Sequence, residues 1–242
     1  MNTEQHRKIV EEALGSEAIM SREALGWVIT ANLHSDWYQL DAKRHFDNAA
    51  SPDDLCAMWY AGFNTYLTRA IVASEPFAPR SRVPRSRRSA LANFGRASHA
   101  LADFYAHTNW VELMAERGSL DLQAPLLGAE LTSDMLPPGL FSGYFNLRYG
   151  LQGCPKQDGH YQPPAGYPAC HATLAKDSPT DGHGAETIPS AGLTYYEAAH
   201  ALAVSATQRL WEVFLKRLNS AYGGQAQNIA TTLAWGQTLQ RA

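Results

Sequence analysis

Apolar residues recur at helical spacing along most of the chain. Near its start, Ile9, Val10, Ala13 and Leu14 fall on one face of a helix expected over residues 4–14. The same spacing, together with capping and helix-breaking residues, predicts further helices over residues 21–33, 52–74, 86–117, 194–222 and, with a weaker pattern, 226–241. No strand-like alternation and no internal repeat is visible in the sequence. We therefore predict one all-α domain, a single helical bundle over residues 1–242.

Two segments depart from this pattern. Residues 137–189 are dense in Gly and Pro, and residues 224–242 form a tail after a Gly-Gly break. An irregular insertion as long as 137–189 is unusual inside a compact domain, so we expect it to be held in place or to have a function, such as covering a cleft. A Cys154–Cys170 disulfide would hold part of it and would imply an oxidising compartment. Three free thiols, with Cys56, in a reducing cytosol is the alternative.

Charge and hydropathy narrow the function classes. The net charge of −3 argues against a general nucleic-acid binder, which would usually be basic. The basic run 79–88 is either a solvated loop or a rim that attracts phosphate headgroups. No apolar run reaches the roughly 18 residues of a membrane helix, and no signal peptide is visible in the first residues. Composition alone leaves cytoplasmic retention and export both open.

The segment Gly95–Trp110 carries the most informative pattern. His99, Asp103 and His107 are spaced four residues apart, which places them on one face of a helix over two turns. Imidazole and carboxylate groups are the ligands that zinc prefers, and one rigid helix can supply several of them. A satisfied set of buried polar groups is the alternative, but three such residues in an otherwise apolar stretch favour a metal site.

Further His and Asp residues lie earlier in the chain. Asp36 and the run His45-Phe46-Asp47-Asn48 form a second group, and His6 lies in the first predicted helix. Helix capping by Asp47 and Asn48 beside an exposed histidine is the alternative for the second group. On its own, His6 would be read as a surface residue.

Together these positions resemble the zinc-dependent phospholipase C superfamily, which includes bacterial phospholipases C, fungal zinc-dependent single-strand nucleases and the fungal heterokaryon-incompatibility C proteins. The resemblance is greatest to the last group. It rests on Gly95-Arg96-x-x-His99-x-x-x-Asp103-Phe104-x-Ala106-His107-x-Asn109. His6, Asp36, His45–Asn48 and Lys176–Pro179 match in the same order, so the resemblance spans about residues 6–207.

The resemblance implies an all-α bundle whose cleft holds two or three Zn²⁺ ions. Asp36, His45, His99 and Asp103 would form one zinc site, Asp103 with His6 a second, and His107 part of a third. The favoured partners of His107 are Glu197 and His200, which lie on a predicted rigid helix. His171, Asp177 and the pair His183–Glu186 are the alternatives. One departure is that the amino-terminal Trp ligand of the bacterial enzymes has no counterpart near Met1.

The resemblance also implies a reaction. Zinc-activated water would hydrolyse the glycerol-side phosphodiester of a phospholipid at a membrane surface, with Asp36 orienting or deprotonating the water. Asn32 and Asn109 would hold ligands in place. The aromatic neighbours Trp37, Phe46, Tyr105 and Trp110 are either core or a wall for lipid chains or headgroups. A single-strand nuclease or nucleotidase and a non-enzymatic incompatibility module are the alternatives. Family habit and the expected disulfide favour an extracytoplasmic location.

Overall fold

The computed structural model describes residues 2–38, 41–75, 83–150 and 152–236, with the backbone alone for 83–86. The helices in this part of the chain are α1 (Thr3–Leu14), α2 (Arg22–Ser35), α3 (Ala42–His45), α4 (Pro52–Trp59), α5 (Thr65–Ala73), α6 (Val83–His107), α7 (Trp110–Glu116), α8 (His171–Leu174), α9 (Tyr195–Tyr222) and α10 (Ala226–Trp235). A π-helical turn, η2 (Tyr60–Asn64), joins α4 to α5. Short 3-10 turns are η1 (Asp36–Tyr38), η3 (Pro125–Leu127), η4 (Ser133–Met135), η5 (Leu147–Tyr149), η6 (His183–Ala185) and η7 (Gly223–Gln225). The expectation of a mainly α-helical fold is confirmed.

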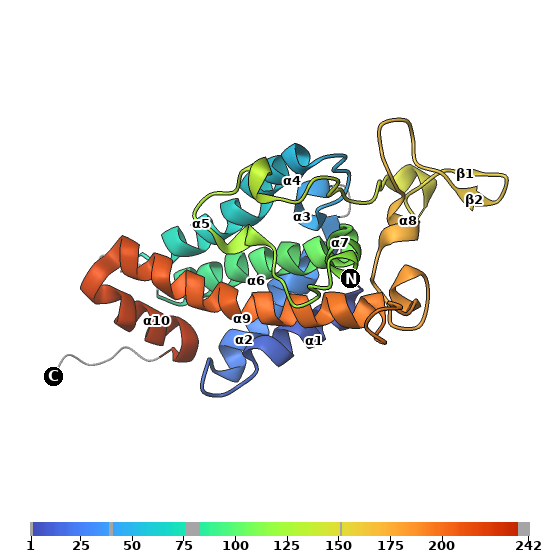
Figure 1. Ribbon diagram of the computed structural model, residues 1–242. Coiled ribbons are helices and arrows are strands. Elements are labelled where there is room, and N and C mark those ends of the chain that lie inside the picture. The colour runs from blue at the N-terminus through green and yellow to red at the C-terminus, as the bar shows by residue number, and fades with distance from the viewer. Residues whose placement is uncertain (1, 39–40, 76–82, 151, 237–242) are drawn as a thin grey trace.

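Helix α6 runs through the middle of the bundle and contacts α2, α5 and α9 (Figure 1). Small residues allow this close packing. A side chain at Gly95 would collide with the backbone carbonyl of Val28 on α2, so the two helices can approach only because Gly95 has none. The face of α6 that carries His99 and Asp103 is fully buried. The central helix therefore presents polar side chains to the interior.

Two predicted helices are interrupted. The helix expected over 52–74 contains the π-helical turn Tyr60–Asn64, and the helix expected over 86–117 breaks after His107. The break has a local cause, because the N–H of Asn109 donates to the carbonyl of Phe141 at 3.1 Å. In addition, the carbonyl of His107 accepts from the N–H of Gly143 at 3.0 Å. The segment 141–143 thus caps the end of α6 and draws the irregular segment against the bundle.

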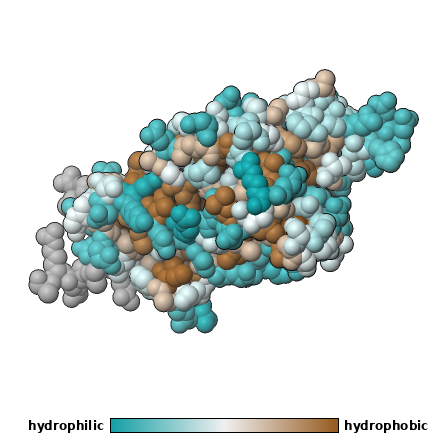
Figure 2. Space-filling view, in the orientation of Figure 1, coloured by the Kyte–Doolittle hydropathy of each residue, from teal (hydrophilic) through white to brown (hydrophobic). Residues whose placement is uncertain are grey.

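The irregular segment 137–189 lies at one end of the bundle (Figure 1). It contains α8, η5, η6 and an antiparallel hairpin of β1 (Lys156–Gln157) and β2 (His160–Tyr161). The hairpin projects from the helices and is hydrophilic (Figure 2). The expected disulfide between Cys154 and Cys170 is present, with 5.8 Å between the Cα atoms, and it ties the hairpin to the start of α8. Cys56 is a buried free thiol.

The tail also has structure where it is described. Helix α10 contacts α9, α2 and α6, and the buried Arg87 donates to the carbonyl of Leu233 at 2.9 Å. Among the described residues, no helix combines the length and apolarity that crossing a membrane requires. Most of the predicted basic rim, residues 79–82 and the side chains of 83–86, lies outside the described part of the chain.

Candidate metal centre

Buried histidine and aspartate side chains from several elements converge on one face of α6. Helix α6 supplies His99, Asp103 and His107 from three successive turns, as the spacing predicts. His6 reaches them from α1, and His45 from the end of α3. Asp36 joins them from the end of α2. The structure thus brings together six of the predicted ligands, all but Glu197 and His200.

The carboxylate of Asp103 is the centre of the first group. His45 Nδ1 and His99 Nε2 each lie 3.0 Å from Asp103 Oδ2, and 3.2 Å separates the two nitrogens. A tetrahedral zinc ion with bonds of about 2.0 Å separates its ligand atoms by roughly 3.3 Å. These three atoms therefore have the spacing of a zinc site. Asp36 Oδ1, 3.7 Å from His99 Nε2, is placed to be a fourth ligand.

The other oxygen of Asp103 faces a second group. His6 Nε2 lies 3.0 Å from Asp103 Oδ1, and His107 Nε2 lies 3.8 Å from the same oxygen. His6 also stacks on His99 with 4.2 Å between ring centroids, and its Nε2 is 4.0 Å from Asp36 Oδ1. Because its two oxygens face different histidines, the carboxylate of Asp103 is oriented to bridge two cations.

Several ring nitrogens here have no hydrogen-bond partner among the residues that the structure describes. They are His6 Nδ1 and Nε2, His45 Nε2 and His99 Nδ1, all buried. His6 Nε2 is the most informative, because it lies 3.0 Å from a carboxylate oxygen without the alignment of a hydrogen bond. Buried polar atoms usually have partners, since leaving one unpaired costs free energy. Converging lone pairs of imidazole and carboxylate fit a zinc ion, so the residues present suit the group that the sequence implies.

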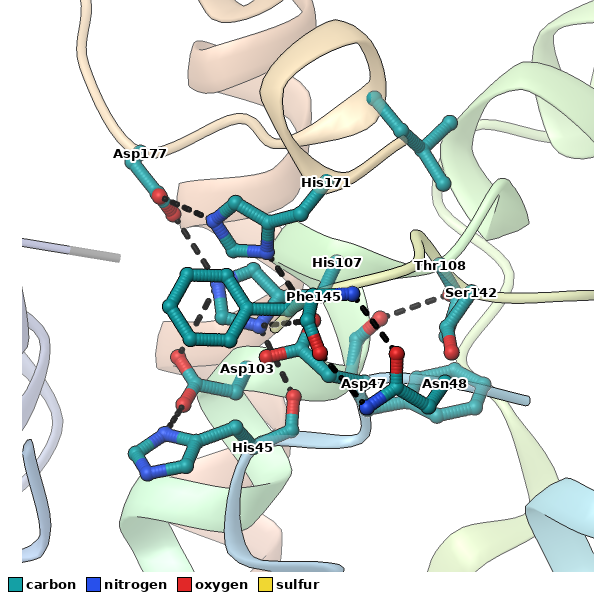
Figure 3. Close-up of polar contacts among 12 residues, drawn as sticks. His45, Asp47, Asn48, Asp103, His107, Thr108, Ser142, Phe145, His171 and Asp177 are labelled. Carbon is teal, nitrogen blue, oxygen red and sulfur yellow. Dashed lines mark hydrogen bonds and ion pairs between the residues drawn. The ribbon is translucent and has the colours of Figure 1, made fainter. Parts of the chain in front are cut away.

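A third group forms around His107 (Figure 3). His107 Nδ1 lies 2.8 Å from the carbonyl of His45, which can only accept, so we assign the hydrogen to Nδ1 and the lone pair to Nε2. That Nε2 is 3.1 Å from Asp177 Oδ1. His171 Nε2 lies 3.3 Å from Asp177 Oδ2, and its Nδ1 lies 3.0 Å from Asp47 Oδ1. Asp47 thus orients His171, and Asp177 links the two histidines.

The turn that carries Asp47 has an uncommon backbone. Phe46 and Asn48 have φ values of 52° and 67°, in the left-handed region. Asn48 compensates by pairing with the backbone of Phe145: its Nδ2 donates to the carbonyl at 3.0 Å, and its Oδ1 accepts from the N–H at 2.7 Å. Such conformations cost about 1–3 kcal/mol each and persist where surrounding contacts enforce them. Here they direct Asp47 to the site (Figure 3).

Burial and neighbouring charges shift the titration of these groups. Burial raises the pKa of Asp36 and lowers that of His99 well below its usual range. Burial would also raise the pKa of Asp103, but electrostatic interactions with the surrounding histidines hold the pKa well below its usual range. For His171, burial opposes the charged ring, yet the carboxylates of Asp47 and Asp177 raise the pKa to about 10. The cluster is thus an anionic pocket that attracts cations.

Two predicted ligands lie elsewhere, which corrects the sequence prediction. Glu197 accepts from the N–H of Thr194 at 2.7 Å and so completes a capping box at the start of α9. His200 Nε2 lies 3.0 Å from Glu12, and its Nδ1 lies 3.2 Å from the hydroxyl of Tyr196. The alternatives His171 and Asp177 occupy the place beside His107.

His183 and Glu186 belong to another cluster. His183 Nδ1 pairs with Glu186 at 2.9 Å, and its Nε2 pairs with Glu112 at 2.8 Å. This cluster includes Lys176 rather than the His107 group. The pair His183–Glu186, the weakest of the predicted alternatives for the third zinc site, therefore contacts Glu112 rather than His107.

The predicted supporting residues also have different partners. Asn32 donates to Ser98 at 2.9 Å, and Asn109 binds the backbone of Gly139 and Phe141, so neither contacts a ligand directly. The carbonyl of His45 supports His107 instead. Of the two alternatives for the aromatic neighbours, core packing holds for Phe46, Tyr105 and Trp110, which are only 0–3% exposed. Trp37 differs, because it is 82% exposed.

Sequence reasoning missed one member of the cluster. Asp47 lies in the His45–Asn48 group but is absent from the predicted ligand sets, although its position two residues after His45 could have indicated a shared role. Met1, on which the question of an amino-terminal ligand depends, lies outside the described residues.

No family model matches the sequence, and neither the comparison with curated proteins nor that with solved structures finds a match. A functional assignment therefore has to come from the residues and their geometry.

Proposed function

We propose that this protein is a zinc-dependent phosphodiester hydrolase of the phospholipase C type. It would hydrolyse the glycerol-side phosphodiester of a phospholipid to diacylglycerol and a phosphorylated headgroup. The observation that carries the proposal is the convergence of His6, His45 and His99 on the two oxygens of Asp103. Within the described part of the chain, His6 Nε2 lacks a hydrogen-bond partner. The sequence resemblance around Gly95–Asn109 supports the same class.

Each group of side chains has a part in this proposal. Asp36, His45, His99 and Asp103 would hold one ion, His6 and the second oxygen of Asp103 another, and His107, His171 and Asp177 a third. Nitrogen-rich sets of this kind suit zinc, whereas Ca²⁺ and Mg²⁺ prefer oxygen ligands throughout. Zinc bound here would act as a Lewis acid and would make hydroxide available near neutral pH.

The exposed edge of the cluster indicates where a substrate would enter and which residue would act on water. Asp36 and Asp177 have side chains 16% and 33% exposed, while His6 and His99 are fully buried. A substrate would therefore enter between the two carboxylates. Asp36 is placed to orient a water molecule and to accept its proton. The buried histidines exclude bulk water behind it, which strengthens the electrostatic interactions of the site.

Two observations bear on the substrate and location. The net charge of −3 disfavours a long polyanionic substrate such as a nucleic acid. The Cys154–Cys170 disulfide agrees with an oxidising, extracytoplasmic place of action. We therefore propose a phospholipid substrate and an extracytoplasmic location.

The test compares metal content and hydrolysis in the wild type and Asp103→Asn, with Glu197→Gln as a control outside the cluster. We expect two or three zinc ions per wild-type chain and hydrolysis of phosphatidylcholine. In Asp103→Asn alone we expect loss of hydrolysis and of the two ions that would share the Asp103 carboxylate. Cleavage of single-stranded nucleic acid instead would assign a nuclease. Zinc that changes only stability would favour a non-enzymatic module, and a chain without zinc would overturn the proposal.

A further inference from the structure

An exposed tryptophan lies directly beside the candidate metal centre. Trp37 follows Asp36 in η1 and is 82% exposed, the largest exposure among the large hydrophobic side chains that the structure describes. The next residue, Tyr38, is 45% exposed. A tryptophan this exposed is uncommon on a protein surface that faces only water. Its indole is suited to the headgroup region of a bilayer, where one end is apolar and the other wet.

A cationic groove adjoins this tryptophan. The ring of His34 stacks on Trp37 with 5.5 Å between centroids, and His34 also lines a groove of about 290 Å³ between α2 and α6. The groove is lined by Trp27, Thr30, Ala31, His34, Arg88, Ala92 and Arg96. The tryptophan and the groove thus form one continuous surface, which we call the Trp37 surface.

The charges of this groove are not compensated within the described part of the chain. Neither Arg88 nor Arg96 forms an ion pair there, and Arg96 has only a 3.4 Å hydrogen bond to Asn93. By contrast, the neighbouring Arg87 is buried and pairs with Glu23 at 2.7 Å. Two guanidinium groups without an ion pair among the described residues provide bidentate donors that match phosphate oxygens. The protein as a whole has a net charge of −3, so this cationic region is a local feature.

We propose that the Trp37 surface docks the protein on a bilayer that contains anionic phospholipid. Trp37 enters the headgroup region, and Arg88 and Arg96 contact headgroup phosphates. Because Asp36 precedes Trp37, docking brings the open edge of the metal centre to the membrane surface. The inference rests on the proposed function and names the surface on which that function acts. Charge complementarity selects a bilayer with anionic lipid over a neutral one.

Co-sedimentation with phosphatidylcholine vesicles, with and without phosphatidylserine, tests the proposal. We expect Trp37→Ala to weaken binding about tenfold, since it removes one large apolar side chain from the interface. Arg88→Gln/Arg96→Gln should weaken binding to phosphatidylserine vesicles by roughly 25-fold, at about fivefold for each basic residue. Higher salt should reduce wild-type binding to the same vesicles.

Matched controls separate the Trp37 surface from general effects. Trp235→Ala removes another exposed tryptophan, 40% exposed, on α10. Arg117→Gln/Lys216→Gln removes two exposed charges elsewhere. Both controls should bind vesicles like the wild type. Equal losses in test and control variants, or a wild type that does not bind phosphatidylserine vesicles, would overturn the proposal.

A monomeric short-chain phosphatidylcholine distinguishes docking from catalysis. The Trp37 and arginine variants should hydrolyse this soluble substrate at the wild-type rate while losing activity on vesicles. Vesicle binding that depends on Trp37 in a protein that hydrolyses neither substrate would keep the docking surface and remove the phospholipase function. Hydrolysis of both substrates at wild-type rates by the variants would keep the function and remove the docking surface.

Discussion

Two polar clusters lie near the end of α6, and they differ in the kinds of charged group that they bring together. In the Lys176 cluster (Lys176, Glu112, His183 and Glu186), the ammonium of Lys176 donates to Glu112 at 2.8 Å and to the carbonyls of Thr108 and Leu174 at 3.0 Å. Its three donors thus have three acceptors, and one oxygen, Glu112 Oε2, lacks a hydrogen-bond partner among the described residues. In the metal centre, by contrast, histidine nitrogens and carboxylate oxygens of the described residues face one another around Asp103.

The comparison distinguishes a structural cluster of polar residues from one that suits a metal ion. A cluster in which a buried lysine faces a carboxylate is structural, whereas converging imidazole and carboxylate lone pairs suit a metal ion. The two clusters are also coupled through the chain. The N–H of Lys176 donates to the carbonyl of Ala106 at 3.0 Å, and Asp177 is the next residue. The Lys176 cluster therefore positions Asp177, a candidate ligand of the metal centre.

The largest expected change in stability comes from breaking the Lys176 cluster. Lys176→Met leaves the buried Glu112 carboxylate without its cation, which should lower the free energy of unfolding by about 3–5 kcal/mol. Urea unfolding measures this, and the loss should be similar with and without zinc. The double variant Lys176→Met/Glu112→Leu removes the uncompensated charge and should recover part of the stability. A single variant as stable as the wild type would contradict the structural role.

The next largest expected change in stability comes from zinc binding. Zinc bound to the folded protein alone should raise the free energy of unfolding by about 4 kcal/mol when free zinc is about 1,000 times the dissociation constant. Asp103→Asn should remove the part of this increase that comes from the two ions sharing its carboxylate, while leaving the chelated protein folded. The control is Glu112→Gln, in the other cluster, which should lower stability but keep the zinc-dependent increase. If zinc stabilises Asp103→Asn as much as the wild type, the bridging role of Asp103 is wrong.

A smaller effect is expected from the disulfide. Cys154→Ser/Cys170→Ser opens a loop with a sequence separation of 16, which should cost roughly 3 kcal/mol in the chain-entropy description. Since Cys170 immediately precedes His171, the variant should also lose affinity for zinc at the His107 group. Zinc at the group of His45, His99 and Asp103 should remain, because α3 and α6 do not depend on the disulfide. Cys56→Ser serves as the control for removing a thiol, and titration calorimetry measures both affinities.

The sequence predicted the helical part of the site and misassigned the irregular part, for physical reasons. His99, Asp103 and His107 follow from the helical period alone, which fixes their common face. The partners of His107 depend on contacts between distant residues, such as Lys176 with Glu112, 64 positions apart. No local pattern encodes such a contact. Preferring a rigid helix over an irregular loop therefore favoured Glu197 and His200 over His171 and Asp177.

One of these errors could have been avoided from the sequence. Thr194 and Glu197 have the Ser/Thr-x-x-Glu spacing of a capping box immediately before an apolar helix. That pattern already assigns the carboxylate of Glu197 to the backbone at the start of α9. The turn at Phe46–Asn48 is different, because its left-handed conformation depends on Phe145, far along the chain.

The smallest expected change in stability tests whether Glu197 caps α9 rather than binding a metal. Glu197→Ala removes the side chain that accepts from the N–H of Thr194, so it should lower the free energy of unfolding by about 1 kcal/mol through the helix cap. Glu197→Gln keeps the capping pattern and should lose less. Zinc content and zinc affinity should be unchanged in both variants, because this carboxylate is committed to the backbone rather than to the metal centre. Loss of one zinc equivalent in Glu197→Ala, with Glu197→Gln intermediate, would instead return Glu197 to the ligand set and remove Asp177 as the preferred partner of His107.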